Sequence, residues 1–302
     1  MKKTLVALAA FAATAAFAEA TIYGTVDQHL VKSTAATKLD GAYSGQALGF
    51  KGSEDLSNGL KANFQVELLP VWNNNGIQNA PAVSNYQSFA GLSGDFGSVR
   101  FGQFFNQQFF NNAAGDATGM SNLGGFSDVS RTGTGTNQAN SIEYTLPTLV
   151  SGLGVIVAKS MDNGGTFSVA NGVVASQTYR LTYATGALNV GYASSKSATA
   201  TNGGLSTAAT SLSASYDLGV AKLFGNTQTY STADKATNMG VSIPFGAAKL
   251  NLNSGSKTVS GAKTSAWIAQ GTYSLSKGTT AVVQRAVSAG VGSTSVGVQH
   301  NF

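Results

Sequence analysis

Apolar and polar residues alternate along most of this chain, up to its last residue, Phe302. The clearest segment spans residues 60–68. Its odd and even positions separate into an apolar set and a polar set: Leu60, Ala62, Phe64, Val66 and Leu68 against Lys61, Asn63, Gln65 and Glu67. Because successive side chains of a β-strand point to opposite faces, this segment predicts a strand with one apolar and one polar face. The same pattern recurs at 141–146 and at 179–184.

Short turn signals separate the alternating segments. They contain Gly, Asp, Asn or Pro, which supply the backbone angles and local hydrogen bonds of tight turns. They lie at residues 53–59, 94–97, 147–152, 185–187, 217–219, 244–247 and 276–278. Each interval between two turns has room for an up-strand, a longer loop and a down-strand. With one strand pair before the first turn and one after the last, we predict sixteen strands, with both termini at the short-turn end.

An even number of strands with short turns at one end is typical of a transmembrane barrel of the outer-membrane type. Lipid cannot satisfy an open sheet edge, so the sheet must close. The expected strands have the length of about 9–11 residues that crosses the hydrocarbon at a tilt. We therefore predict an all-β fold, a sixteen-stranded antiparallel transmembrane β-barrel, wide enough to hold water. A soluble β-sandwich is the alternative, in which the apolar faces would meet in a core.

The composition favours the barrel. Charged residues make up 10% of the chain, against about a quarter in ordinary globular domains, and there are 37 glycines, four prolines and no cysteine. A soluble surface with so few charges would be poorly solvated, whereas a lipid-facing wall needs few. The formal net charge is +5, without a basic tract, so nucleic acid is not an expected partner.

The first twenty residues resemble a secretory signal. Lys2 and Lys3 precede a short apolar stretch, Leu5–Phe17, which is too short to cross a bilayer as a helix. Small residues allow cleavage after Ala18 or Ala20. We expect residues 1–20 to be a signal peptide and residues 21–302 to form the barrel.

One interval is much longer than the others. Residues from about 104 to 139 carry no strand pattern, and long loops in compact folds are usually functional. A solvated loop tip rarely holds many apolar residues, but this interval contains Phe104, Phe105, Phe109, Phe110, Leu123 and Phe126. We therefore expect this third loop to fold inward and to narrow the lumen. The alternative is a disordered extracellular tip.

Alternation also predicts which charges face the lumen, because a lipid-facing Lys or Arg costs about 2–4 kcal/mol at the midplane. The predicted lumenal charges on the strands are Lys61, Glu67, Arg100, Glu143, Arg180 and Lys249. Within the long loop, the charged candidates are Asp116, Asp128 and Arg131, which are either constriction residues or simply solvated. Arg100 is the main wall candidate because it lies mid-strand next to the long loop. Such charges select solutes by electrostatics, without chemistry on them.

Nothing in the sequence favours an enzyme. The two histidines, His29 and His300, are expected on adjacent strands but about 20 Å apart along them, and neither has an acidic neighbour in a triad pattern. No spacing of His, Cys or carboxylates predicts a metal site. We therefore predict no catalytic residue, no metal site and no cofactor.

Several motifs, in order along the chain, resemble one family. They are Ile22–Asp27, Leu48–Leu56, Gly59–Ala62, Gln87–Leu92, Gly94–Val99, Asn140–Tyr144 and Val296–Phe302. Together they are similar to the general porins of Gram-negative outer membranes, which are trimeric sixteen-stranded diffusion channels. The resemblance implies a homotrimer in outer-membrane lipid. It also implies that Phe302 is the aromatic residue read by the outer-membrane assembly machinery.

The chain departs from this family at the basic ladder on the pore wall, which in the family faces acidic residues on the inward third loop. Where the family usually has arginine, this chain has Ala47, Tyr86, Gln103 and either Gln138 or Ala139. The ion selectivity is therefore open.

Taken together, the sequence predicts a passive diffusion channel for ions and small hydrophilic solutes across the outer membrane. A substrate-selective porin is the alternative that the missing arginines favour. A surface adhesin or structural barrel with a plugged lumen is a third interpretation.

Overall fold

The computed structural model describes residues 20–41, 43–70, 72–73, 76–77, 83–121, 123, 137–161, 176–197, 208–230 and 233–302. The leader up to residue 19, Phe126, Asp128 and Arg131, on which sequence-based predictions rest, lie outside these ranges.

Within these residues the chain consists of β-strands and one short helix, α2 (Gln107–Ala114). Before the helix lie β1 (Thr21–Ser33), β2 (Thr37–Asp40), β3 (Ala47–Ser57), β4 (Leu60–Pro70), β7 (Val83–Gly94) and β8 (Gly97–Phe105). β5 (Trp72–Asn73) and β6 (Gly76–Ile77) form a separate two-stranded sheet. The first strands after the helix are β9 (Asn137–Thr145), β10 (Leu153–Ser160), β11 (Ser176–Thr185), β12 (Leu188–Ser197), β13 (Ala208–Asp217) and β14 (Lys222–Tyr230). They are followed by β15 (Lys235–Phe245), β16 (Ala248–Val259), β17 (Ala262–Ser274), β18 (Thr279–Ser288) and β19 (Val291–Asn301).

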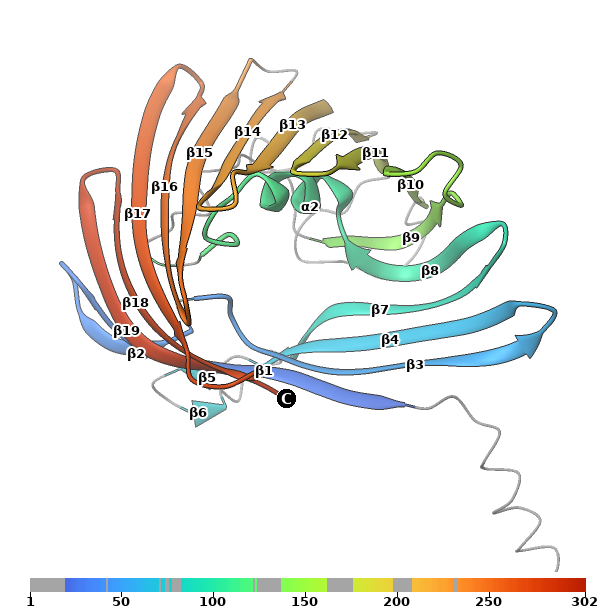
Figure 1. Cartoon of the computed structure of the whole chain (residues 1–302), viewed down its shortest axis with the longest axis horizontal. Coiled ribbons are helices and arrows are strands. Elements are labelled where there is room, and N and C mark those ends of the chain that lie inside the picture. The colour runs from blue at the N-terminus through green and yellow to red at the C-terminus, as the bar shows by residue number, and fades with distance from the viewer. Residues whose placement is uncertain are drawn as a thin grey trace, which may run out of the picture.

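β1 closes the large sheet, because it pairs antiparallel with β19 on one side and with β2 and β3 on the other. β2 pairs with residues 29–32 of β1 and β3 with residues 21–25, so they are two pieces of one wall strand. Counted in this way, the seventeen described strands of the sheet make a sixteen-stranded barrel. Figure 1 shows the resulting ring, in which β1 runs beside β19 and β3. The predicted sixteen-stranded antiparallel barrel is confirmed.

All seven predicted turns join adjacent strands, for example β3 to β4 and β17 to β18. The prediction of long loops at the opposite end is wrong for three connections. Ser260 and Gly261 alone separate β16 from β17, and Ala289 and Gly290 alone separate β18 from β19. All four residues have positive φ, from 49° to 82°, as the two-residue hairpin turn matched to strand twist requires. β14 and β15 are joined by only four residues, 231–234.

The two faces of the wall differ as the alternation predicts. On β13, Leu212 and Tyr216 are 56% and 47% exposed, whereas Ser211 and Ser213 are buried. The exposed apolar set recurs on most strands and forms the apolar face, which is the lipid-facing side of such a barrel. The other set is rich in Ser, Asn and Gln and forms the polar face. In the part of the chain that is described, no helix has the length and apolar character to cross a membrane.

Candidate functional site

Helix α2 follows β8 directly and positions much of the site. Asn106 caps its first turn by accepting a hydrogen bond from the backbone N–H of Gln108 (2.8 Å). The helix ends at Gly115, whose N–H donates to the carbonyl of Asn112 (3.1 Å). Sequence analysis did not predict this helix, because eight residues are too few for the helical spacing of Phe109, Phe110, Ala113 and Ala114 to stand out as a period. The four amide side chains of the helix are buried: Gln107, Gln108, Asn111 and Asn112.

Asn111 holds the middle of α2 against β12 and β13. Its Nδ2 donates to the Oγ of Ser211 (2.8 Å), and its Oδ1 accepts from the Oγ of Ser213 (3.2 Å). Gly191 on β12 makes this approach possible, because a Cβ at that position would collide with the Asn111 side chain. The helix therefore lies directly on the polar face of the wall, beside β11–β13 in Figure 1.

Two wall asparagines bind the carboxyl end of α2. Asn226 Nδ2 donates to the carbonyl of Asn112 (3.0 Å), and Asn238 Nδ2 donates to the carbonyl of Gly115 (3.1 Å). The last carbonyls of a helix have no partner within the helix, so these amides replace water at its end. Neutral hydrogen bonds from β14 and β15 thus fix the helix.

Asp116 follows the helix and is almost fully buried, at 3% exposure. Its Oδ1 accepts from the backbone N–H and from the hydroxyl of Thr118, both at 2.7 Å. Burial raises the pKa of Asp116, although the two Thr118 hydrogen bonds work in the opposite direction. The structure therefore does not bring this predicted constriction residue to Arg100.

The described end of the same segment contacts the wall again at β17, β18 and β1. Ser121 Oγ donates to Oε1 of Gln284 (2.6 Å). Leu123 is 1% exposed and belongs to an apolar cluster on the otherwise polar face, with Val31, Ala266, Ile268 and Ala286. Residues 106–123 are therefore attached to the wall at several strands, from β11 to β1.

Arg100 and Glu143 form the main ion pair of the site. Arg100 Nη2 lies 2.7 Å from Glu143 Oε1, and the two residues are direct partners in the register of β8 and β9. Gly91 is the partner of Arg100 on β7, where a Cβ would collide with the Val99 carbonyl oxygen and crowd the Cα and Cβ of Arg100. The alternation had assigned both charges to one face, but it did not pair them.

Gln107 links this pair to a second arginine. Its Nε2 donates to Glu143 Oε2 (2.7 Å), and its Oε1 accepts from Arg180 Nη1 (3.4 Å). The cluster thus has two guanidinium groups and one carboxylate. Arg100 contacts the Glu143 carboxylate directly, whereas Arg180 makes a long hydrogen bond to Gln107, which in turn donates to Glu143.

Aromatic rings surround the arginines. The Arg100 guanidinium carbon lies 4.5 Å from the ring centre of Phe104 and 4.7 Å from that of Phe89. Arg180 lies 5.9 Å from Phe110. Such contacts stabilise a cation by about 0.5–2 kcal/mol, depending on how far it is desolvated. Arg100 is therefore held between two rings and one carboxylate.

A cavity of about 520 Å³ opens beside this cluster. Its lining includes the charged and amide groups Arg100, Glu143, Arg180, Gln107 and Asn63, the ring of Phe110, and the hydroxyls of Ser93 and Ser98. Helix α2 contributes one side of the cavity and the polar face of β4, β7, β8, β9 and β11 the other. The arrangement can bind ions and polar solutes through charge and hydrogen bonds.

Other predicted site residues lie apart from this cluster. Lys61 pairs with Asp55 (2.7 Å) near the β3–β4 turn, where its side chain is 52% exposed. Glu67 accepts a hydrogen bond from the hydroxyl of Tyr23 (2.6 Å). Phe302 exchanges two backbone hydrogen bonds of 3.1 Å with Gly24 on β1.

The sequence analysis missed the acidic partner of His29. Asp27, two residues earlier on the same face, places Oδ1 2.8 Å from His29 Nε2, and Ser295 Oγ lies 3.3 Å from His29 Nδ1. All three residues are buried, and Asp27 Oδ2 also accepts from the backbone N–H groups of residues 43–45. This carboxylate holds the segment between β2 and β3 over the β1–β19 seam.

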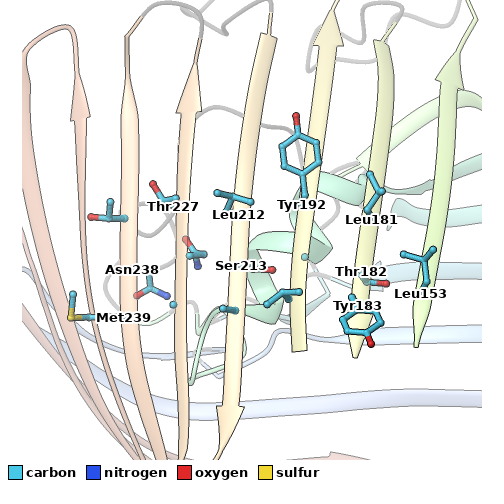
Figure 2. Close-up of a pocket in the computed structure, with 16 residues that line it drawn as sticks. Leu153, Leu181, Thr182, Tyr183, Tyr192, Leu212, Ser213, Thr227, Asn238 and Met239 are labelled. Atoms are coloured by element: carbon cyan, nitrogen blue, oxygen red, sulfur yellow. The ribbon is translucent and has the colours of Figure 1, made fainter. Parts of the chain in front are cut away.

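A larger groove, of about 810 Å³, lies on the apolar face of β10–β15. Figure 2 shows its walls, with Leu181, Tyr192 and Leu212 standing out from the strands and Met239 at one edge. The polar side chains of these strands, including Ser213, bind α2 on the other side of the wall. The groove therefore faces lipid and is not the candidate solute site. Among the described residues, no group of three or more His, Asp or Glu side chains could hold a metal ion.

The sequence and the fold were compared with those of known proteins. Residues 4–290 match the profile of the Gram-negative porins. The major outer membrane protein P.IB of Neisseria meningitidis is 37% identical over 121 residues, which are 34% of each chain. The protein of that name from Neisseria gonorrhoeae is 38% identical over 116 residues, or 34% of this chain and 32% of its own. The chain thus matches about a third of the length of these curated relatives.

Solved structures agree with the fold. An anion-selective porin from Comamonas acidovorans superposes with a TM-score of 0.77 at 22% identity, covering 95% of this chain and 100% of that one. OmpF of Salmonella typhi, in complex with daunomycin, superposes with a TM-score of 0.76 at 16% identity, covering 94% and 97% of the two chains. At these identities the likeness concerns the fold. With the family profile matched along nearly the whole sequence, the chain belongs to the Gram-negative porins.

Proposed function

We propose that the protein is a passive diffusion channel for ions and small hydrophilic solutes across the Gram-negative outer membrane. The observation that carries this proposal is the polar cavity with Arg100, Glu143 and Arg180 beside α2, on the polar face of a closed sixteen-stranded barrel. A barrel of this strand number is wide enough for an aqueous channel. The family and the names of the relatives point to a channel rather than an enzyme.

The third loop, about residues 104–139, is the proposed constriction. Its described part is attached to β11–β14 and to β17, β18 and β1, and the cavity lies between α2 and the strands β4, β7, β8, β9 and β11. Arg100 and Arg180 are the proposed wall cations of the narrow region, and Glu143 is their counter-charge. Because Asp116 is buried against its own loop, it adds no negative charge there. We infer a weak preference for anions.

The remaining assignments follow the sequence patterns and, for the trimer and Phe302, the family resemblance. Residues 1–20 are proposed as the signal peptide and residues 21–302 as the barrel. Lys61 and Glu67 are proposed as lining residues on the strands, and Asp128 and Arg131 as constriction residues of the long loop. We also propose a homotrimer in outer-membrane lipid, with Phe302 read by the assembly machinery.

Planar-bilayer recordings of the refolded protein test this function. We expect stepwise, ohmic conductance in KCl, and a reversal potential across a salt gradient that corresponds to a chloride-to-potassium permeability ratio above one. Weak KCl conductance together with saturable block by a single solute would favour the substrate-selective alternative, for which the aromatic rings beside the cavity are the favouring observation. The absence of any conductance from correctly folded protein would favour a plugged barrel and contradict the proposed channel function.

A further inference from the structure

Helix α2 has its polar and apolar sides arranged opposite to those of an ordinary surface helix. Its amide residues, including Asn111 and Asn112, are fully buried against the wall, while Phe109 and Phe110 keep part of their surface exposed. A surface helix normally buries its apolar side. Here the hydrogen bond of Asn111 to Ser211 and that of Asn226 to the Asn112 carbonyl hold the polar side on the wall. The aromatic side of α2 faces the space beside the helix.

The rings on this side form one continuous surface. Phe105 lies 5.5 Å from both Phe109 and Phe110, and its ring is within 19° of parallel to that of Phe109. Tyr86 extends the surface, with its ring edge-on to Phe105 at 4.5 Å. Phe110 lines the 520 Å³ cavity. A planar solute in the cavity therefore meets an aromatic face at one side.

Charge at the same place favours one class of solute. Arg100 is already engaged by Glu143 and by two rings. Arg180 makes one long hydrogen bond, of 3.4 Å, to Gln107 and lies 5.9 Å from the Phe110 ring. It interacts with Glu143 through charge without an ion-pair contact, and its buried Nε has no hydrogen-bond partner among the described residues. Two guanidiniums and one carboxylate leave a single surplus positive charge, located at Arg180. That charge can be balanced by one anionic group.

We propose that the cavity is a binding site for aromatic monocarboxylates, with the carboxylate on Arg180 and the ring against Phe110. Guanidinium and carboxylate form charge-assisted hydrogen bonds with matched planar geometry. Offset or edge-on contact between aromatic rings adds to the area buried. This inference rests on the proposed channel function, which brings the solute to the cavity.

The same geometry disfavours the neighbouring classes of solute. A neutral sugar or alcohol leaves the Arg180 charge unmatched, and an organic cation is repelled by it. A saturated ring keeps the carboxylate contact but loses the ring quadrupole. A second carboxylate on the solute would meet Glu143, which is already the acceptor for Arg100 and Gln107.

Benzoate is the probe for the test. Its block of the KCl current through single channels is compared with that by acetate, cyclohexanecarboxylate and benzyl alcohol. We expect benzoate to block at a concentration at least about tenfold below that of acetate, with cyclohexanecarboxylate between the two. R180Q should raise the half-blocking concentration of benzoate about tenfold. F110L, which keeps an apolar side chain but removes the ring, should raise it about threefold.

K277Q, in the β17–β18 turn, removes the same charge as R180Q far from the cavity and should leave benzoate block unchanged. Ligand-detected NMR of benzoate with the folded protein in micelles measures binding without any current. Normal KCl conductance with equal weak block by benzoate and acetate overturns this inference and leaves the channel intact. Absent conductance from protein that still binds benzoate overturns the channel alone.

Discussion

Arg100 and Glu143 face each other across β8 and β9, with Arg100 Nη2 2.7 Å from Glu143 Oε1. The acid that balances the wall arginine therefore comes from the adjacent strand, not from the described part of the long loop. Strand register fixes this pair more firmly than a loop contact would, because neither backbone segment can move without breaking the sheet. The charge balance of the narrow region can thus be changed by single substitutions on the wall.

E143Q should increase the preference for anions. The substitution removes the only carboxylate of the cluster and leaves two guanidiniums beside the cavity. We expect the chloride-to-potassium permeability ratio, from reversal potentials in a KCl gradient, to rise about twofold or more. E54Q removes an equal charge near the turn end of β3 and should leave the ratio unchanged. An unchanged ratio in E143Q would mean that ions pass elsewhere.

N111A should loosen α2 from the wall. It removes the hydrogen bonds to Ser211 and Ser213 and leaves buried partners unsatisfied, at a cost of about 1–3 kcal/mol. Hydrogen exchange at residues 107–114 should become faster. N189A, an exposed asparagine on β12, is the matched control and should leave exchange there unaltered. Equal protection from hydrogen exchange in N111A and the wild type would show that the other attachments of the loop are enough to hold α2 on the wall.

G191A tests the close approach of helix and wall. The added methyl group would collide with the Asn111 side chain, so α2 must shift away from β12. We expect single-channel conductance to change and its open-state noise to increase, since the loop loses its defined position. G225A is the control, because its Cβ would meet only the Asn238 carbonyl oxygen at an ordinary 3.7 Å. Identical recordings from the two variants would contradict the steric argument.

Asp116 should make the docking of the loop depend on pH. Burial raises its pKa above the ordinary value of 3.8, so the docked loop binds the proton more tightly than the undocked loop. The docked state is therefore most stable below that value and loses stability as pH rises through the raised pKa. Amide protection at residues 106–121, corrected for intrinsic exchange, should fall over that range.

D116N should abolish this pH dependence, because the amide stays neutral while it can still accept from Thr118. D55N, which alters an exposed carboxylate near the β3–β4 turn, should retain it. A pH profile of D116N that parallels the wild type would assign the effect to another group.

The strands and the seven short turns were predictable because their signals are local. The alternation of apolar and polar residues over 60–68 predicts which side chains share a face. Asn58 and Gly59 favour the turn that follows β3. The hairpins at Ser260–Gly261 and Ala289–Gly290 were missed, because Ser-Gly and Ala-Gly are weaker turn signals than Asn-Gly. Their left-handed backbone is imposed by the paired strands on either side.

The site was predictable only in part. Arg100, Glu143 and Arg180 fall on the polar face by parity alone, but the pairing of Arg100 with Glu143 depends on the register between strands. Asp116 looked like a constriction charge, since a sequence does not show that a loop carboxylate will be buried. Asp27 was overlooked as the partner of His29, although two residues of one strand separated by a single position share a face.

The sequence by itself determined the strand number, the closed barrel and the identity of its polar and apolar faces, because side-chain alternation and turn chemistry act over a few residues. Tertiary structure alone decided that α2 lies with its amides on the wall and its rings toward the cavity. That orientation depends on partners far along the chain, such as Ser211 and Asn226, and on the space at Gly191. Hydrogen bonds between segments far apart in the sequence, such as the one from Asn111 to Ser211, and not local hydrophobicity, hold α2 in this orientation.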